Sequence, residues 1–207
     1  MSRLFTILSF DIGIKNLAYC LLEYDASISD LNFNIIEWNV VNIENETNTS
    51  NHDTLFVTLH ELFGQTHFDY VIIENQPALK NPVMKTIQIM VYSHFKHMQI
   101  LNDKDIIDIR MCNACNKLRF AMKLYPISEL NLKTPESNKY KRNKEAAIAY
   151  TSKLINAQDK RENIDFFESF KKKNDLADTL LQGLYFCSTL TKTVSTKRSK
   201  ITPIVSL

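Results

Sequence analysis

Glycine is scarce in this sequence, and the scarcity excludes one class of binding site. The chain of 207 residues has only three glycines, too few for the glycine-rich loops that hold nucleotide phosphates. It also lacks the run of ~18 uncharged apolar residues that a membrane-spanning helix needs, and it does not open with the basic and then apolar pattern of a signal peptide. We therefore expect a soluble intracellular protein with no membrane association and no nucleotide cofactor.

Cysteine and net charge are also low. Four cysteines, only two of them close together, predict no disulfide framework and favour a reducing compartment. The formal net charge of +2 excludes a uniformly basic nucleic-acid coat. Lys and Arg are instead concentrated in the last third of the chain, in NKYKRNK, FKKKN and TKTVSTKRSK. Each run alone is typical of a solvated face, but the three together indicate a surface that can bind a polyanion.

Apolar residues are abundant enough for one domain with a full core. The sequence is 44% hydrophobic and 23% charged, as expected for a folded chain of this length. We predict a single domain over residues 1–190, followed by a basic C-terminal tail over residues 191–207.

The hydrophobic pattern predicts strands first and helices last, with strand, helix and strand between them. That order indicates an α/β fold with a mixed sheet and helices on both faces. A tight connection follows the first strand, in which Gly13 and Asn16 can take positive φ. Residues 111–137 read as loop-rich. The predicted strands are 4–10, 17–23, 33–41, 70–73 and 105–110, and the predicted helices are 54–63, a helix beginning near Pro82, 143–155, 164–170 and 175–190.

Four acidic residues stand next to apolar elements. Asp11 ends the first predicted strand and Glu74 ends the fourth, while Asp175 and Asp178 are three residues apart on one side of the last helix. Taken singly, each is explained as a turn former, a strand end or an acid near a helix N-terminus. Four carboxylates converging in a cleft of low dielectric would repel one another, and a divalent cation removes that repulsion.

Oxygen ligands of this kind select Mg²⁺ or Mn²⁺. Two such ions about 3.5–4 Å apart can support the attack of water on a phosphodiester, one activating the water and the other stabilising the leaving oxygen. The acids therefore indicate phosphodiester hydrolysis as a chemistry to test.

Three segments carry a more specific pattern, in chain order: SFDIGIKNLAYCLLE, VIIENQPALKNPVMKTIQIMVYSHF and KKNDLADTLLQ. Together they resemble the poxvirus-type Holliday junction resolvases, RuvC-like members of the RNase H-like superfamily that also occur in other large DNA viruses. The resemblance covers most of the chain, and ENQP followed by a proline-started helix is its narrowest signal. It implies an RNase H-like fold with a five-stranded mixed sheet.

The resemblance also implies an activity. This is metal-dependent, paired nicking of four-way DNA junctions by a homodimer, in viral recombination and concatemer processing. The place of action would be the site of viral DNA replication, in the cytoplasm if the virus is poxvirus-like. Carried over residue by residue, the catalytic metal ligands are Asp11, Glu74, Asp175 and Asp178, holding two Mg²⁺ or Mn²⁺ ions.

The family also has an active-site lysine at the start of a helix that precedes the one carrying the two aspartates. Lys144 is our choice, because Lys144, Ile148, Thr151 and Ile155 follow one line of a helix. Lys141 and Lys139 are alternatives.

Three other functions compete with junction resolution. Another RNase H-like nuclease, acting on RNA–DNA hybrids or at transposon ends, would share the acids. A module that binds branched DNA without cutting it would not need a complete set of them. Actin-like and sugar-kinase-like ATPases also begin with a strand, Asp-x-Gly and a hairpin, but they need two lobes and further glycine pairs.

Three further features have two readings each. Cys112 and Cys115 supply two of the four ligands of a zinc site but have no second pair, and a turn with buried thiols is the alternative. His94 and His97, three apart on a helix, either bind a metal or form a solvated or DNA-facing edge. The helical region 80–98 supplies a dimer surface, or packs its apolar stripe on the sheet, or does both with different faces.

Overall fold

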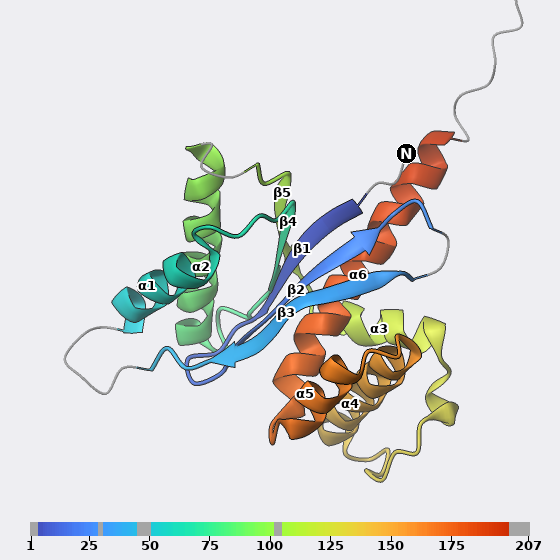
Figure 1. Cartoon of the computed structure of the whole chain (residues 1–207). Helices are drawn as coiled ribbons and strands as arrows, with labels where there is room; N and C mark the ends of the chain where they lie inside the picture. The colour runs from blue at the N-terminus through green and yellow to red at the C-terminus, as the bar shows by residue number, and fades with distance from the viewer. Residues whose placement is uncertain (1–3, 29–30, 45–50, 102–104, 199–207) are drawn as a thin grey trace, which may run out of the picture.

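A five-stranded mixed sheet forms the centre of the molecule (Figure 1). The computed structural model describes residues 4–28, 31–44, 51–101 and 105–198, with the backbone alone for 191–198. The spatial order of the strands is β3-β2-β1-β4-β5. Their bounds are β1 (Leu4–Asp11), β2 (Leu17–Asp25), β3 (Phe33–Val41), β4 (Tyr70–Glu74) and β5 (Asp108–Cys112).

The strand directions bring two acidic strand ends to one edge of the sheet. β1, β2 and β3 are antiparallel neighbours, whereas β4 runs parallel to β1 and β5 parallel to β4. Phe10 of β1 lies opposite Ile73 of β4, so the next residue in each strand, Asp11 and Glu74, reaches the same edge. Glu74 in turn lies opposite Cys112, the last residue of β5.

Helices cover both faces of the sheet. In Figure 1, α1 and α2 lie on one side, and α6 lies on the other with α3, α4 and α5 packed around it. A separate hydrophobic core fills each side. The helices are α1 (Asn51–Phe63), α2 (Pro82–Ile100), α3 (Cys115–Leu124), α4 (Lys139–Ala157), α5 (Arg161–Ser169) and α6 (Lys173–Arg198), with a 3-10 turn η1 at Ile127–Glu129.

The start and the buried face of α2 follow from its sequence. Asn81 caps the helix by accepting a hydrogen bond from the backbone N–H of Met84, and Pro82 occupies its first position. Ile87, Val91 and Phe95 are buried against the sheet. The predicted apolar stripe of this helix therefore packs on the sheet.

α6 approaches the sheet closely, and this contact fixes its register. A Cβ added at Gly183 would lie 2.8 Å from Cδ2 of the buried Leu22, so the helix backbone can come this near only with a glycine there. The neighbouring Gln182 donates from Nε2 to the hydroxyl of Ser9, at 3.1 Å, and to the carbonyl of Phe10, at 3.0 Å. These contacts place the start of α6 beside the end of β1.

Some local predictions were wrong. Residues 111–137, expected to be loop-rich, contain α3 and η1. The apolar pattern did not reveal α3, because one of the residues on its buried face is a lysine. No described glycine has a positive φ, and neither does Asn16. Gly13 is needed for space instead, since a Cβ there would lie 2.4 Å from the carbonyl oxygen of Asn16.

One predicted segment falls partly outside the described residues. The basic tail over 191–207 begins within α6, whose backbone continues to Arg198, while residues 199–207 are not described. Among the described helices, none is both long enough and apolar enough to cross a membrane.

Candidate metal centre

Three carboxylates from distant parts of the chain meet at the edge of the sheet. Asp11 ends β1, Glu74 ends β4 and Asp178 lies near the start of α6. One oxygen from each lies within 4.8 Å of the other two. The three acids therefore form a cluster that can bind a divalent cation.

The cluster is electrostatically strained without a cation. Burial, together with the charges of Glu74 and Asp178, raises the pKa of Asp11 well above its ordinary value. Burial also raises the pKa of Asp178, against the opposing effect of Lys117. Both carboxyl groups therefore bind a proton more readily than a solvated acid does, and a bound cation would compete with that proton.

Lys117 of α3 partly balances these charges, and our sequence reasoning did not identify it. Its Nζ lies 2.9 Å from Oε2 of Glu74 and 2.9 Å from Oδ2 of Asp178, and its side chain is only 8% exposed. Burial lowers the pKa of Lys117, but Asp178, Glu74 and Asp11 more than offset this, and the net shift is upward. The ammonium is therefore held charged among the acids. The sequence carries no signal for it, because hydrophobic patterning assigns a lysine to solvent.

Asp175 lines the same cleft but lies outside the cluster of three. Asn174 donates to its Oδ1, while its Oδ2 is buried without a hydrogen-bond partner among the described residues. Burial raises the pKa of Asp175, whereas Lys172 and Lys144 oppose the rise. A buried carboxylate oxygen with no protein partner is one that an ion or an ordered water can satisfy.

Lys144 also lines this cleft, on the α4 side. Its Nζ lies over the ring of Tyr140, 4.8 Å from the ring centroid. A hydrogen bond with Tyr140 raises its pKa, and the charges of Asp175 and Asp178 add to the rise. The two alternatives, Lys139 and Lys141, are exposed in the first turn of the same helix. Lys117, not Lys144, thus contacts the clustered acids directly.

The loop after Glu74 is held from two sides. The backbone N–H of Asn75 donates to the carbonyl of Cys112, at 2.8 Å, and that of Gln76 donates to Oε1 of Gln88, at 2.7 Å. Gln88 is a fully buried residue of α2, and Lys85 of the same helix also donates to its Oε1. The ENQ segment is therefore tied to β5 and α2, which fixes the direction of the Glu74 side chain.

The residues of the cleft fit a divalent cation. Three clustered carboxylates supply the oxygen ligands that Mg²⁺ and Mn²⁺ prefer. Burial is the main cause of the raised pKa values of Asp11 and Asp178, and the charge of Glu74 adds to both. Asp175, with its unpartnered oxygen, lines the same cleft.

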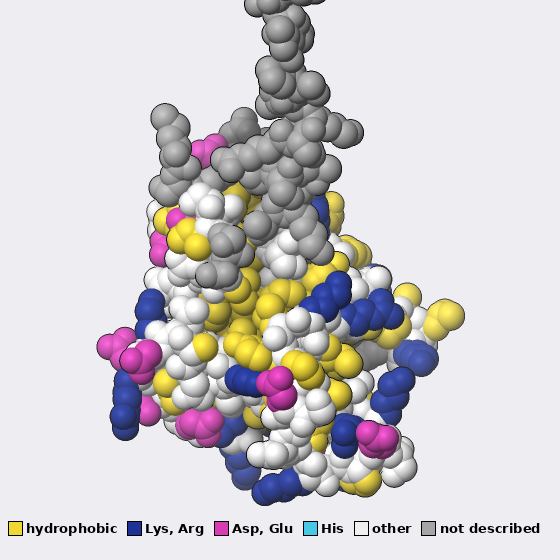
Figure 2. Space-filling view, turned by 90° about the vertical axis from the view of Figure 1, so that its right-hand side faces the viewer, with side chains coloured by type: hydrophobic (Ala, Val, Ile, Leu, Met, Phe, Trp, Pro, Cys, Tyr) yellow, Lys and Arg dark blue, Asp and Glu magenta, His cyan; other side chains and the backbone are white. Residues whose placement is uncertain are grey.

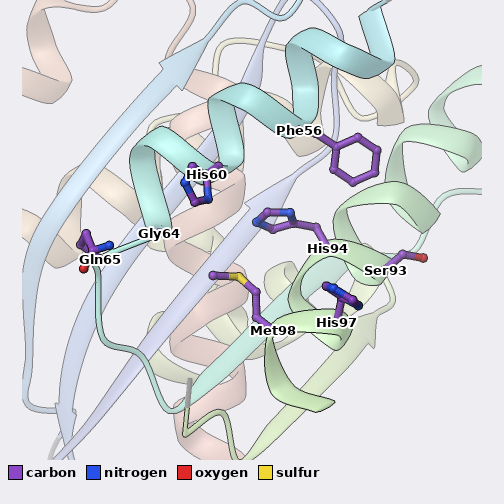
Figure 3. Close-up of a pocket in the computed structure, with 8 residues that line it drawn as sticks. All are labelled: Phe56, His60, Gly64, Gln65, Ser93, His94, His97 and Met98. Atoms are coloured by element: carbon purple, nitrogen blue, oxygen red, sulfur yellow. The ribbon is translucent and has the colours of Figure 1, made fainter. Parts of the chain in front are cut away.

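The histidines form a separate cavity on the other side of the sheet. A cavity of about 750 Å³ lies between α1 and α2, lined by His60, His94 and His97 (Figure 3). Burial and the other two imidazoles lower the pKa of His94. Within the described chain, the three acids alone bring three ligand atoms within 4.8 Å of one another, so neither these histidines nor Cys112 and Cys115 form a metal site of that kind.

Comparisons of sequence give a family and a viral relative. Residues 7–66 match the model of a family described as mitochondrial resolvase Ydc2 / RNA splicing MRS1. Uncharacterized protein L451 of Acanthamoeba polyphaga mimivirus is 34% identical over 132 residues, which are 62% of this chain and 31% of that protein. The chain thus spans about a third of the length of this relative.

Several solved structures are similar over nearly the whole chain. Yeast mitochondrial Holliday junction resolvase Ydc2 has a TM-score of 0.65 at 18% identity, covering 95% of this chain and 86% of that one. Fowlpox virus resolvase in complex with its Holliday junction DNA has a TM-score of 0.58 at 18% identity, covering 89% and 98%. Thermus thermophilus RuvC in complex with a Holliday junction has a TM-score of 0.55 at 11% identity, covering 92% and 97%.

At these identities the structural likeness establishes the fold. The five-stranded mixed sheet with helices on both faces was predicted from the sequence and is confirmed. The chain has the RuvC-like form of the RNase H-like fold, and the resemblance to Holliday junction resolvases that its motifs predict is confirmed.

Proposed function

We propose that this protein is a metal-dependent endonuclease that resolves four-way DNA junctions by paired, symmetric nicks. The observation that carries the proposal is the meeting of Asp11, Glu74 and Asp178 within 4.8 Å at the edge of the sheet. The intact acid set at the carboxyl ends of β1 and β4 is what hydrolysis of a phosphodiester needs.

Each residue of the cleft has a role in this proposal. Asp11, Glu74 and Asp178 would hold Mg²⁺ or Mn²⁺, with Asp175 adding an oxygen for a second ion. Bound there, the ions would supply an activated water and a stabilised leaving oxygen. Lys117 holds the acids together when they are charged, because its ammonium contacts two of them at 2.9 Å. Lys144, on the α4 side of the cleft, is placed to contact a phosphate of the bound strand.

The basic character of the helical side supports DNA as the substrate. Figure 2 shows the side formed by the helices around α6, where Lys and Arg side chains are spread over the lower and right-hand parts with acidic side chains between them. Such a surface can neutralise phosphates without reading bases, so recognition would depend chiefly on junction shape. Two copies in a homodimer would place two active sites on opposing strands.

A viral role is the finer part of the proposal. The relative at 34% identity is a mimivirus protein, and two of the similar structures are complexes with Holliday junction DNA. We infer that the protein acts on viral recombination products and concatemers where viral DNA is replicated in the infected cell.

Two alternatives remain for the same fold. A nuclease acting on RNA–DNA hybrids would use the same acids. A nucleic-acid-binding protein without cleavage is the other, since the matched family description also names RNA splicing. The complete acid cluster favours a nuclease over the binding module, because a protein that only binds would have no use for three strained carboxylates.

The deciding experiment compares substrates with and without Mg²⁺. We expect the purified protein to cut a synthetic four-way junction, but neither a linear duplex nor an RNA–DNA hybrid, and only with the metal. Glu74→Gln and Asp178→Asn should each lose cleavage by more than the ~10–100-fold typical of residues that only support a metal ligand. Both should still bind the junction.

The matched control is Glu129→Gln. Glu129 is a half-exposed acid that pairs with Lys153 away from the cleft, and its loss should leave cleavage unchanged. Wild-type cutting rates in Glu74→Gln would contradict the metal assignment. Products on the hybrid alone would favour the first alternative.

A further inference from the structure

The segment Cys112–Cys115 connects β5 to α3 directly beside the acidic site, and the proposed function uses neither thiol. Cys112 ends β5 opposite Glu74 and is buried. Cys115 is the first residue of α3, is exposed, and lines the cleft that contains Asp11 and Glu74. The thiol of Cys115 is therefore accessible from the cleft, whereas that of Cys112 is buried at the end of β5.

The backbone between the two cysteines is already turned tightly. The N–H of Asn116 donates to the carbonyl of Asn113, at 3.0 Å, and Ala114 has helical dihedrals of φ −51° and ψ −33°. Cys112 is the last residue of β5 and Cys115 is the first residue of α3, so this turn lies between the two cysteines. A disulfide requires a Cβ separation of ~3.5–4.5 Å, which a Cys-x-x-Cys segment reaches in dithiol–disulfide proteins.

Both sulfurs also face one side-chain amide. Nδ2 of Asn116 lies 4.0 Å from Sγ of Cys112, and Oδ1 of the same side chain lies 3.7 Å from Sγ of Cys115. The two thiols thus lie on the same side of the turn. A zinc site is not supported, because no further His, Cys, Asp or Glu of the described chain completes a ligand group with them.

We propose that Cys112 and Cys115 form a reversible disulfide by exchange with a small disulfide such as oxidised glutathione, and that this bond switches the neighbouring acidic site off. The thiolate of Cys115, the exposed residue, attacks one sulfur of oxidised glutathione, and one glutathione leaves as its thiolate. The thiolate of Cys112 then attacks Sγ of Cys115, and the second glutathione leaves. The two protein thiols lose two protons and two electrons, and these reduce one glutathione disulfide to two glutathione thiols.

The effect on the acidic site follows from two contacts. Lys117, two residues after Cys115, reaches Glu74 and Asp178 from the first turn of α3. The carbonyl of Cys112 accepts the N–H of Asn75, next to Glu74. Bringing the sulfurs to their bond length of ~2.05 Å tightens the turn between these two contacts. It therefore shifts Lys117 and the Glu74 loop relative to each other.

A switch of this kind suits a protein of a reducing compartment, where disulfides are transient and act in redox sensing. The formation of the disulfide is independent of the proposed function, whereas the switching of cleavage rests on the proposed function.

The first experiment tests the bond in the full-length protein. The protein is equilibrated in glutathione buffers of increasing disulfide content, quenched by alkylation and mapped by mass spectrometry of its peptides. We expect a disulfide between Cys112 and Cys115 that dithiothreitol reverses, while the buried Cys20 and Cys187 stay alkylated as thiols after denaturation. Cys115→Ser and Cys112→Ser should each remove the disulfide. Its absence from the wild type in the most oxidising buffer would overturn the proposal.

The second experiment tests the switch. Oxidised wild type should cut the junction at least about 10-fold more slowly than reduced wild type, and dithiothreitol should restore the rate. In Cys115→Ser the ratio of the oxidised to the reduced rate should be close to unity. Equal rates for oxidised and reduced wild type would overturn the switch. If the reduced protein cuts no substrate, the proposed function fails instead. The switch is then tested without cleavage, by comparing the rise in Tm that Mg²⁺ causes in the oxidised protein with the rise in the reduced protein; equal rises would overturn it.

Discussion

Lys117 is a buried cation whose partners come from two other elements of the fold. Its side chain is 8% exposed, while those of its partners Glu74 and Asp178 are 14% and 21% exposed. Removing one member of a buried ion pair leaves its partners uncompensated, which costs far more than losing a surface pair. The stability of the metal-free protein should therefore depend on this single residue.

Lys117→Met tests this dependence. We expect the substitution to lower the free energy of unfolding of the metal-free protein by ~3–5 kcal/mol at neutral pH, because the acids then repel one another without a counter-charge. Denaturant unfolding measures the change. Lys15→Met is the control, since Lys15 forms an exposed pair with Glu44, and its loss should cost about 1 kcal/mol or less. Equal losses for the two variants would contradict the role given to Lys117.

Asp11 makes the stability of the metal-free protein depend on pH. Its pKa in the folded state is raised well above the ordinary value of 3.8, so in the window above 3.8 the folded protein binds more protons than the unfolded one. The stability contributed by this group is therefore lost as the pH rises through that window.

Asp11→Asn should remove this loss. We expect the metal-free variant to gain Tm over the wild type, and to gain more at about pH 8 than at about pH 5. Mg²⁺ competes with the proton, so it should raise the Tm of the wild type more at the higher pH and have little effect on the variant. Differential scanning calorimetry with and without Mg²⁺ measures both effects. A pH-independent difference would show that Asp11 is not the titrating group. Asp165→Asn, which removes an exposed acid, is the control.

At the scale of elements, the start of α6 is fixed by Trp38 of β3. The indole N–H donates to the carbonyl of Leu176 and to the hydroxyl of Thr179, both at 3.1 Å. The ring stacks on Phe167 of α5, with centroids 5.2 Å apart and planes 5° apart. These contacts join three elements next to the two acids of α6.

Trp38→Phe should loosen this junction without touching the acids. We expect the free energy of unfolding to fall by about 1–3 kcal/mol, because two hydrogen bonds donated by the indole N–H and part of a buried ring are lost. Cleavage well below the Tm should be nearly unchanged, since Trp38 does not line the cleft. Thr179→Ser, which keeps the hydroxyl acceptor, should cost less. A large loss of cleavage in a still-folded Trp38→Phe would mean that the stack positions Asp178.

Elements with a simple apolar pattern were predictable from the sequence, whereas α3, which has a lysine on its buried face, was not. β3 was predicted to the residue, and the buried face of α2 follows its spacing of Ile87, Val91 and Phe95. α3 instead buries Lys117 beside Phe120 and Ala121, so a pattern that assigns lysine to solvent cannot detect it. The partners that make its burial favourable lie 43 and 61 residues away in sequence, at Glu74 and Asp178.

The acidic site was likewise only partly predictable from the sequence. Strand ends and helix spacing led us to expect four converging carboxylates, Asp11, Glu74, Asp175 and Asp178. The structure clusters three of them, and Asp175 lines the same cleft outside the cluster. The lysine was sought at Lys144, where α4 has a clear apolar line, and the ammonium nearest the clustered acids is that of Lys117. Only the three-dimensional path of α3 distinguishes the two.

At the scale of the whole molecule, the sheet separates two unlike sides. α1 and α2 cover one face, and α3 to α6 form the side on which the acidic cleft opens (Figure 1). Lys139 and Lys141 are exposed in the first turn of α4, next to the cleft-lining Lys144. Lys96 lies on α2, on the far face, where it donates to Gln99. DNA gripped at the cleft would meet the first two lysines and not the third.

The salt dependence of junction binding tests this asymmetry. The logarithm of the binding constant falls linearly with the logarithm of the salt concentration. Each phosphate neutralised by a lysine releases counterions and makes this slope steeper by ~0.9. Substituting both Lys139 and Lys141 by Gln should therefore make the slope shallower by up to about 1.8, with weaker binding at low salt, whereas Lys96→Gln should leave it unchanged. Fluorescence anisotropy of a labelled four-way junction across a salt series measures the slope. If Lys96→Gln changed it as much as the double variant, the DNA would have to contact the α2 face as well, and the cleft side could not be the sole DNA-binding surface.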